Sequence, residues 1–379
     1  MAGITWGQLR ELAAFRAENG CAVSLYVNLD PSEAPTAAAV ETRVNSQLSE
    51  AQRRADERKA SMTHDQREGL KADLERIRQW FDDGFDRQGG VRGVAVFAAS
   101  LDNFWSTLSL PESVPDNVKI ATELYLAPLT PQVDRDGALV AAVGRERGEV
   151  FRLRGGALVE IADESTDVPG RHDQGGWSQA RYERHIENVV GQHLREVADT
   201  LDTCVRRLRA VPIVLVGAEE IRSEFEELLS KETRDCLAGW ASAEAHADGP
   251  QLLEAARPVL DGWWRRREEA LLERWREEAG KNGRAAAGWE QTLEAASDGR
   301  VELLLVQDGV DQPAYECPKC GRAQTTGGSC PLDGTTMVSR ENGVDVAVHK
   351  TLAHGGTVHV IRDRQDLEPV GGIAALLRF

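Results

Sequence analysis

The sequence predicts an α/β protein of three successive domains, and three observations indicate this fold class. Apolar strand-like runs alternate with helical patterns along the 379-residue chain, which is typical of layered α/β domains. Stretches rich in Pro, Gly or small polar residues at 126–137 and 243–250 interrupt this alternation and predict domain boundaries. The composition, 41% apolar and 28% charged, is that of ordinary globular proteins. We therefore expect domains at residues 1–132, 133–248 and 249–379.

In the first domain, the β-branched and aromatic run at 21–30 predicts a strand that ends in an Asp-Pro turn. Residues 37–85 are rich in Glu, Arg, Ala and Leu, with a short break at 61–64. Their spaced apolar positions predict two amphipathic helices that cover a sheet. Two further strands are expected at 91–100 and 104–110.

In the central domain, three short apolar segments within 137–161 are separated by Gly-containing turns, which predicts an antiparallel meander. A polar stretch then leads into a long helical pattern at 178–209. The apolar run at 211–217 predicts a buried strand, and a further helix is expected at 219–229.

The third domain begins with a Trp-, Arg- and Glu-rich helical pattern at 252–279. A helix at 289–296 and a strand at 301–307 follow, and then a Cys-containing insert at 317–330. A helix-to-strand pattern at 345–361 and the Gly-Gly segment 369–379 complete the domain.

The charge balance and the missing motifs exclude several classes of function. With 45 Lys and Arg against 62 Asp and Glu, the net charge of −17 argues against a protein that coats nucleic acid with its whole surface, but it allows a local basic patch. The chain has no nucleophile elbow, phosphate-binding glycine loop or zinc-protease motif. Its apolar runs are too short for a membrane span, no secretory signal is visible, and six cysteines are too few for a disulfide scaffold. We expect a cytoplasmic protein.

The segment that starts at Arg171 is the most informative part of the central domain. Gly175 and Gly176 lie in a polar stretch, and Ser178 is placed to cap the helix that follows. Arg181, Arg184 and His185 share one face of the first helical turns, so a cationic cluster lies beside the glycine pair. The cluster comprises Arg171, His172, Arg181, Arg184 and His185. Two interpretations are open: a site for a phosphate backbone, or a solvated surface loop.

The insert in the third domain carries the motifs CPKCG and CPLDG, with nine residues between the second and the third cysteine. Cys-x-x-Cys-Gly is typical of a zinc knuckle. The predicted ligands are Cys317, Cys320, Cys330 and, where a fourth cysteine is usual, Asp333. We expect one structural zinc ion; a metal-free knuckle and a redox pair are the alternatives. The remaining cysteines, Cys21, Cys204 and Cys236, fall in apolar patterns that predict buried thiols.

The central segment resembles a loop of the archaeal and eukaryotic class-I release factor family, which carries Gly-Gly-Gln-Ser, two residues, Arg, an aromatic residue, one residue and Arg. Gly175-Gly176, Ser178, Arg181, Tyr182 and Arg184 match that pattern, whereas Trp177 stands at the glutamine position. The closing segment, PVGGIAALLRF, resembles the end of the same family's third domain. The nearest resemblance is to bacterial members of this superfamily, which include Balon-type hibernation factors. Pelota-type and Vms-like factors are more distant.

The resemblance implies a third domain similar to kink-turn-binding ribosomal proteins, and a central domain that reaches the rRNA of the peptidyl-transferase centre. The implied ribosome- and RNA-binding residues are Arg171, His172, Gln174, Gly175, Gly176, Trp177, Ser178, Arg181, Arg184 and His185. Implied partners are the ribosome, tRNA and a translational GTPase, with the protein a monomer when free and no membrane contact. The first domain shows none of the stop-codon-reading motifs of the eukaryotic factors.

In the family, the loop glutamine promotes attack of water on the peptidyl-tRNA ester. Trp177 has no side-chain amide, so we expect a factor that binds the ribosomal A site for hibernation, protection or rescue without strong catalysis. The alternative within this class is a peptidyl-tRNA hydrolase or cleaving factor, with Gln174 and Gln179 as the candidate catalytic residues. Outside the class, the alternative is an RNA-binding scaffold that does not enter the A site.

Overall fold

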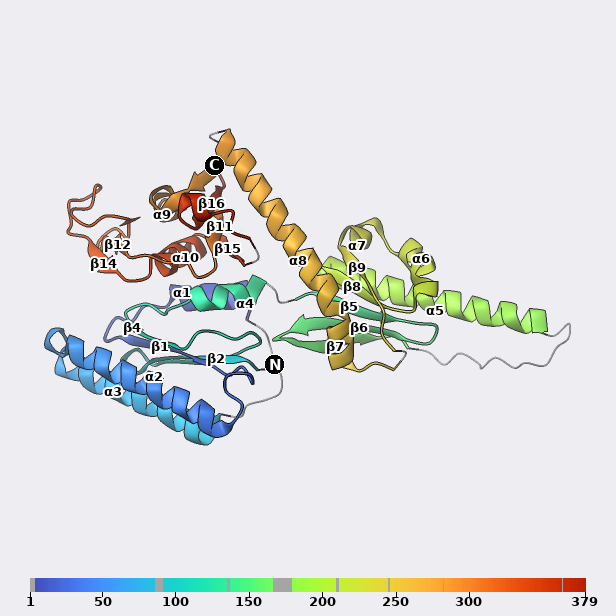
Figure 1. Cartoon of the computed structure of the whole chain (residues 1–379), viewed down its shortest axis with the longest axis horizontal. Helices are drawn as coiled ribbons and strands as arrows, with labels where there is room; N and C mark the ends of the chain where they lie inside the picture. The colour runs from blue at the N-terminus through green and yellow to red at the C-terminus, as the bar shows by residue number, and fades with distance from the viewer. Residues whose placement is uncertain are drawn as a thin grey trace. The chain divides into compact units, whose positions relative to one another are not determined.

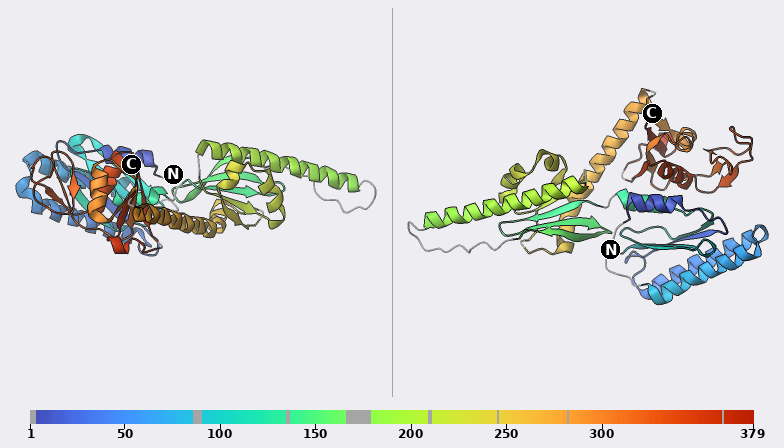
Figure 2. Two further views of the ribbon diagram at one scale, coloured as in Figure 1. Left: turned by 90° about the horizontal axis from the view of Figure 1, so that it is seen from above. Right: turned by 180° about the vertical axis from the view of Figure 1, so that it is seen from behind.

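The computed structural model describes residues 4–85, 91–134, 137–165, 179–208, 211–244, 246–281, 283–362 and 364–379. The chain forms two compact units: Met1–Asp134 together with Glu268–Phe379, and Arg135–Arg267. Figure 1 labels the elements, and Figure 2 shows them from two further sides. No helix in the described ranges is long and apolar enough to cross a membrane.

The N-terminal part of the first unit is an antiparallel sheet with the strand order β3-β2-β1-β4. Its strands are β1 (Ala22–Asn28), β2 (Gly93–Ala99), β3 (Phe104–Leu110) and β4 (Asn117–Ala121). The predicted helical pair, α2 (Ala37–Arg58) and α3 (His64–Gln79), is confirmed and packs on one face, over Val23, Leu25 and Val27. The other face carries α1 (Trp6–Ala14) and α4 (Thr130–Asp134). Short turns of 3-10 or π helix lie at Lys59–Ser61, Trp80–Gly84, Ser100–Asp102 and, as η4, at Ala127–Leu129.

The C-terminal part of the first unit is a mixed sheet with the order β10-β16-β11-β15, in which β11 and β15 are parallel. Its strands are β10 (Ala285–Ala287), β11 (Val301–Gln307), β15 (Thr357–Ile361) and β16 (Ile373–Leu377). Helices α9 (Gly288–Ser297) and α10 (Gly343–Ala353) pack against it, and a 3-10 turn at Glu368–Val370 precedes β16. The insert forms a separate sheet of β12 (Ala314–Glu316), β13 (Ala323–Gln324) and β14 (Val338–Arg340).

The second unit contains a sheet with the order β7-β6-β5-β8-β9. Strands β5 (Leu139–Val143), β6 (Gly148–Arg154) and β7 (Ala157–Asp163) form the predicted antiparallel meander. Strands β8 (Ile213–Gly217) and β9 (Leu237–Ala241) continue the sheet in parallel with β5. One face carries α5 (Gln179–Leu208), α6 (Glu219–Leu228) and α7 (Lys231–Asp235). The first part of α8 (Gly249–Gly280) covers the other face.

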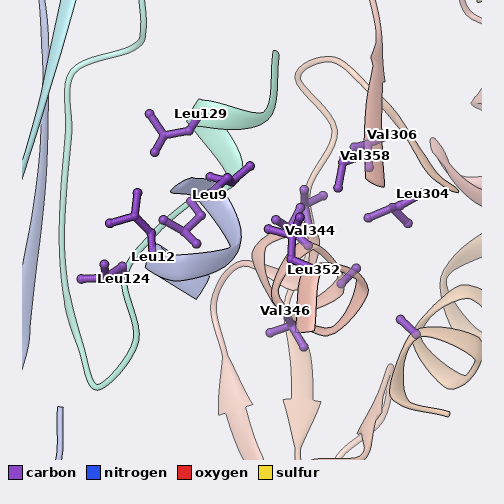
Figure 3. Packing of buried hydrophobic residues seen from close by; sticks show 14 of the residues in the cluster. Leu9, Leu12, Leu124, Leu129, Leu304, Val306, Val344, Val346, Leu352 and Val358 are labelled. Atoms are coloured by element: carbon purple, nitrogen blue, oxygen red, sulfur yellow. The ribbon is translucent and has the colours of Figure 1, made fainter. Parts of the chain in front are cut away.

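A single hydrophobic core joins the N-terminal and C-terminal parts of the first unit. Leu9 and Leu12 of α1, together with Leu124, belong to the same buried cluster as Val344 and Leu352 of α10. Figure 3 shows the side chains labelled on α1 and those labelled on α10. The regions expected to form a first and a third domain therefore share their apolar interior, and burial of this kind contributes about 25 cal/mol for each Å² removed from water.

Candidate functional site

The release factor-like segment joins β7 to α5, and the structure describes only part of it. Of the predicted site, Arg171, His172, Gln174, Gly175, Gly176, Trp177 and Ser178 lie outside the described residues. Gln179, Arg181, Arg184 and His185 belong to the first turns of α5, where the structure describes the backbone. The predicted cationic face remains a prediction.

Helix α5 carries this segment away from the core of its unit. From residue 187 onward, where the structure describes the side chains of α5, the buried apolar residues include Val190, Leu194, Val197, Leu201 and Val205, whereas Glu187 and Asn188 are exposed. At about 1.5 Å of rise per residue, the helix start at Gln179 lies roughly 16 Å beyond Val190. Figures 1 and 2 show this end of α5 projecting past the sheet. The geometry places the start of α5, at Gln179, away from the anchored part of the helix.

Two residues that sequence patterns did not single out fix α5 to the sheet. The His193 side chain is 2% exposed, and its Nε2 lies 3.2 Å from the carbonyl oxygen of Arg147 in the β5–β6 turn. At Gly148 the helix approaches so closely that a Cβ atom would lie 2.4 Å from Cγ2 of Val197. Only glycine fits there without a shift of the backbone or the helix. Neither contact can be recognised from the neighbouring sequence, because each joins residues more than 40 positions apart.

The insert brings together the four residues predicted as metal ligands. One ligand atom from each of Cys317, Cys320, Cys330 and Asp333 lies within 4.8 Å of the others. The Sγ atoms of Cys320 and Cys330 are 3.5 Å apart, and Cys317 Sγ lies 3.6 Å from Asp333 Oδ1. Four ligands held tetrahedrally at Zn–S distances of about 2.3 Å would lie about 3.8 Å from one another. The donor set and its spacing therefore fit a zinc ion.

The two halves of this cluster use the same backbone turn. The N–H of Gly321 donates to the carbonyl oxygen of Cys317 at 2.9 Å, and the N–H of Gly334 donates to that of Cys330, also at 2.9 Å. Both glycines have positive φ angles, +78° and +74°, which side chains rarely adopt. Asp333 thus holds the position in the second turn that Cys320 holds in the first.

The surroundings of the turns lower the pKa of Asp333 and of Cys317, whereas the pKa of Cys320 is raised to about 11. The backbone N–H of Thr335 donates to Asp333 Oδ1 at 2.9 Å and lowers the pKa of this carboxyl to about 2. At Cys317, burial raises the pKa of the thiol, but the backbone N–H groups of Lys319 and Cys320 outweigh it, so the pKa lies below its usual value. Cys317 and Cys330 are buried, whereas Cys320 is exposed.

Ion pairs attach the insert to the two helices beside it. Glu316, next to the first ligand, accepts from Lys350 Nζ of α10 at 2.7 Å and from Arg340 Nε at 2.9 Å. Arg322 donates to Glu294 of α9 at 2.7 Å. Charged pairs on both sides thus fix the orientation of the cysteine turns.

The prediction that the other three cysteines are buried is wrong, because all three are partly exposed. Cys21, Cys204 and Cys236 are half-buried, because each lies at the margin of a hydrophobic cluster rather than inside it.

Comparison with known families gives two adjacent matches. The family described as bacterial archaeo-eukaryotic release factor family 10 matches residues 125–261. The domain described as eRF1 domain 3 matches residues 266–379. Together they span the central and C-terminal regions, including α5 and the cysteine insert.

Individual proteins show the same likeness. Peptide chain release factor subunit 1 of Archaeoglobus fulgidus is 24% identical over 398 aligned positions, covering 98% of this chain and 96% of that protein. Among solved structures, Pelota of Archaeoglobus fulgidus matches with a TM-score of 0.35 and 15% identity, covering 100% of this chain and 94% of the other. A chain from a structure described as a model of ribosome-bound archaeal Pelota and ABCE1 matches with a TM-score of 0.40 and 14% identity, covering 100% of this chain and 95% of the other.

Proposed function

Because this chain is a member of the archaeal and eukaryotic release factor-like superfamily, we propose that it is a translation factor that binds the ribosome. The likeness to a peptide chain release factor along 98% of the chain supports this proposal, since it includes the N-terminal region as well as the two matched domains. A role in rescue or protection also agrees with the presence of Trp177 in the loop.

One residue supports a role without strong catalysis. Trp177 stands where the resembled loop carries the glutamine that assists attack of water on the ester. An indole N–H can donate a hydrogen bond, but the side chain has no acceptor with which to orient water. Its flat face is suited to stacking on an unpaired base, which contributes roughly 1–3 kcal/mol per base in single-stranded sites. The proposed role is therefore occupation of the A site in hibernation, protection or rescue.

The position of the segment supports this proposal. In the sequence it directly precedes α5, which is packed in the core from Val190 onward and whose backbone extends about three turns before that residue. A rigid helix of this kind can place a short segment deep in a narrow RNA cavity at little cost in conformational entropy. The segment itself has the glycine pair and three arginines that contact with a phosphate backbone requires.

Two measurements test the proposal. Purified protein is first sedimented with ribosomes, where co-sedimentation is expected; its absence would favour a scaffold that does not enter the A site. The protein is then mixed with ribosomes that carry peptidyl-tRNA, and released peptide is counted. We expect little release from the wild type, weaker ribosome binding by Trp177→Ala and some release activity in Trp177→Gln. Rapid release by the wild type that Gln174→Ala or Gln179→Ala abolishes would make the protein a peptidyl-tRNA hydrolase.

We also propose that Cys317, Cys320, Cys330 and Asp333 bind one structural zinc ion. The ligand spacing and the repeated glycine turn support this assignment. A bound zinc would tie the turn that leads into β13 to the turn that leads into β14, which a sheet of such short strands needs for stability.

A further inference from the structure

We propose that the same cysteine cluster is an oxidation site, at which a peroxide joins Cys320 to Cys330 in a disulfide and so releases the bound metal. This inference rests on the proposed zinc site, and it assigns to the cluster a sensitivity to oxidants in addition to its structural role.

The geometry selects this pair of cysteines. Cys320 is exposed, so an oxidant in solution reaches its sulfur, and the Sγ of Cys330 lies 3.5 Å away. A disulfide bond is about 2.05 Å long, so the two sulfurs need to approach by only about 1.5 Å. Each cysteine belongs to a different turn, and a hinge movement of either turn supplies that distance. Cys317 also interacts with both of these thiols, but it is buried, so an oxidant in solution reaches it less readily.

The reaction balances with a peroxide as the oxidant. The Cys320 thiolate attacks one peroxide oxygen and breaks the O–O bond, which gives a sulfenic acid and hydroxide. The Cys330 thiolate then attacks the Cys320 sulfur, forms the S–S bond and expels a second hydroxide. Two sulfurs are each oxidised by one electron, and with two protons the peroxide is reduced to two water molecules.

Because Asp333 stands where a fourth cysteine is usual, one disulfide is enough to release the metal. A four-cysteine site that forms one disulfide keeps two thiolates, whereas this cluster keeps only Cys317 and Asp333. Two ligands, one of them a carboxylate that is harder than zinc prefers, do not hold the ion against water. A single two-electron oxidation therefore empties the site.

The other thiols of the chain differ in ways that make them suitable controls. Cys21, Cys204 and Cys236 are only half-buried, but peroxide in solution reaches them less readily than it reaches the exposed Cys320. They belong to hydrophobic clusters of the N-terminal sheet and the central unit, away from the insert.

The test uses the full-length protein, with its zinc content measured before any treatment. Hydrogen peroxide is added stepwise, released zinc is followed with a chromogenic chelator, and disulfides are mapped by mass spectrometry after alkylation. We expect the loss of one zinc per chain together with a Cys320–Cys330 disulfide, and recovery after dithiothreitol and zinc. Cys204→Ser is expected to behave as the wild type. Asp333→Cys is expected to retain zinc at the peroxide dose that empties the wild type.

The outcomes separate this inference from the zinc assignment. If the zinc-loaded protein keeps its metal at a peroxide dose that oxidises its methionines, the proposed oxidation site is wrong but the zinc site stands. Zinc loss with sulfinic acids but no disulfide, or with a Cys317 disulfide, would also overturn the oxidation site. A protein isolated without zinc under metal-replete conditions would contradict both assignments, and ribosome binding is measured independently of either.

Discussion

The carboxylate of Asp345, in helix α10, accepts a 2.8 Å hydrogen bond from the backbone N–H of Leu126, which lies 219 residues earlier in the chain. The N–H of Ala127 donates to the same oxygen at 3.1 Å, and Lys119 Nζ lies 3.3 Å from the other. Asp345 is 5% exposed, so it is a buried carboxyl group that caps the start of η4 from another part of the chain. The N-terminal and C-terminal parts of the first unit are thus joined by charged hydrogen bonds as well as by a common apolar core.

Replacing this carboxylate will destabilise the first unit. We expect Asp345→Ala to lower the free energy of unfolding by about 2–4 kcal/mol, because it leaves two backbone N–H groups without their acceptor and removes the ion-pair partner of the half-buried Lys119. Urea unfolding followed by circular dichroism measures the change. Asp308→Ala, at an exposed carboxylate near the end of β11, is the matched control and should change stability by less than about 0.5 kcal/mol. Equal effects of the two substitutions would contradict the assigned role of Asp345.

Burial of the Asp73 carboxyl group makes the stability of the protein depend on pH. Its side chain is 2% exposed, and burial raises its pKa to about 6, although the N–H of Ser100 donates to it at 2.9 Å. The pKa in the folded state lies above the unfolded value of about 3.9, so the folded protein binds this proton more tightly than the unfolded chain does. Protonated Asp73 therefore contributes to stability at low pH, and that contribution is lost as the pH rises from about 4 through 6.

Asp73→Asn keeps an acceptor for Ser100 and removes the buried charge. We expect this variant to be more stable than the wild type by about 1–2 kcal/mol at pH 7.5 and equal to it near pH 4. Melting temperatures of the two proteins at both pH values test the expectation. A stabilisation of the same size at pH 4 would show that the charge of Asp73 is not its cause.

The zinc ligands should differ in strength. Elemental analysis of protein purified without chelator is expected to show about one zinc per chain. Cys320→Ala should lower zinc affinity more than Asp333→Ala, because thiolate is the softer ligand and binds zinc more strongly than a carboxylate. Competition with a chelator of known affinity ranks the variants. Fully folded wild-type protein without metal would refute the site.

Ribosome binding should depend on salt through the arginines near the glycine pair. We expect Arg171→Ala, Arg181→Ala and Arg184→Ala each to flatten the slope of log affinity against log salt by roughly 0.7–0.9 units, the value for one lost phosphate contact. Binding is measured between low and physiological salt. Arg206→Ala, on the exposed surface at the opposite end of α5, is the control and should leave the slope unchanged. An unchanged slope in all four variants would place the RNA contact elsewhere.

The local elements could be predicted from the sequence because their causes are local. The helical pair within 37–85 and the meander within 137–161 follow from apolar spacing and turn residues, and both are confirmed. The spacing of the cysteines and the aspartate also predicted the four residues that the structure places together as possible metal ligands. In each case the residues that determine the structure lie within a few turns of one another.

The long-range features could not be predicted in this way. The nine-residue helix α1 is held by packing of Leu9 and Leu12 against distant residues, and it has too few apolar positions to give a periodic signal. The bond from Leu126 to Asp345 spans most of the chain, and an isolated aspartate in a helix carries no sign of its partner. The role of residues 171–178 stays a prediction, since they lie outside the described part of the chain.

The common core also has a consequence for synthesis of the protein. Its first half, with Leu9, Leu12 and Leu124, is made before the residues 135–267 of the other unit, and α10 is made later still. At about 5–20 residues per second, roughly 10–40 s pass before Val344 and Leu352 leave the ribosome. During that interval α1 is already made, but the side of the shared cluster that α10 later covers stays exposed to solvent. A growing chain of this protein is therefore a substrate for the chaperones that shield nascent polypeptides, until its own C-terminal helix replaces them.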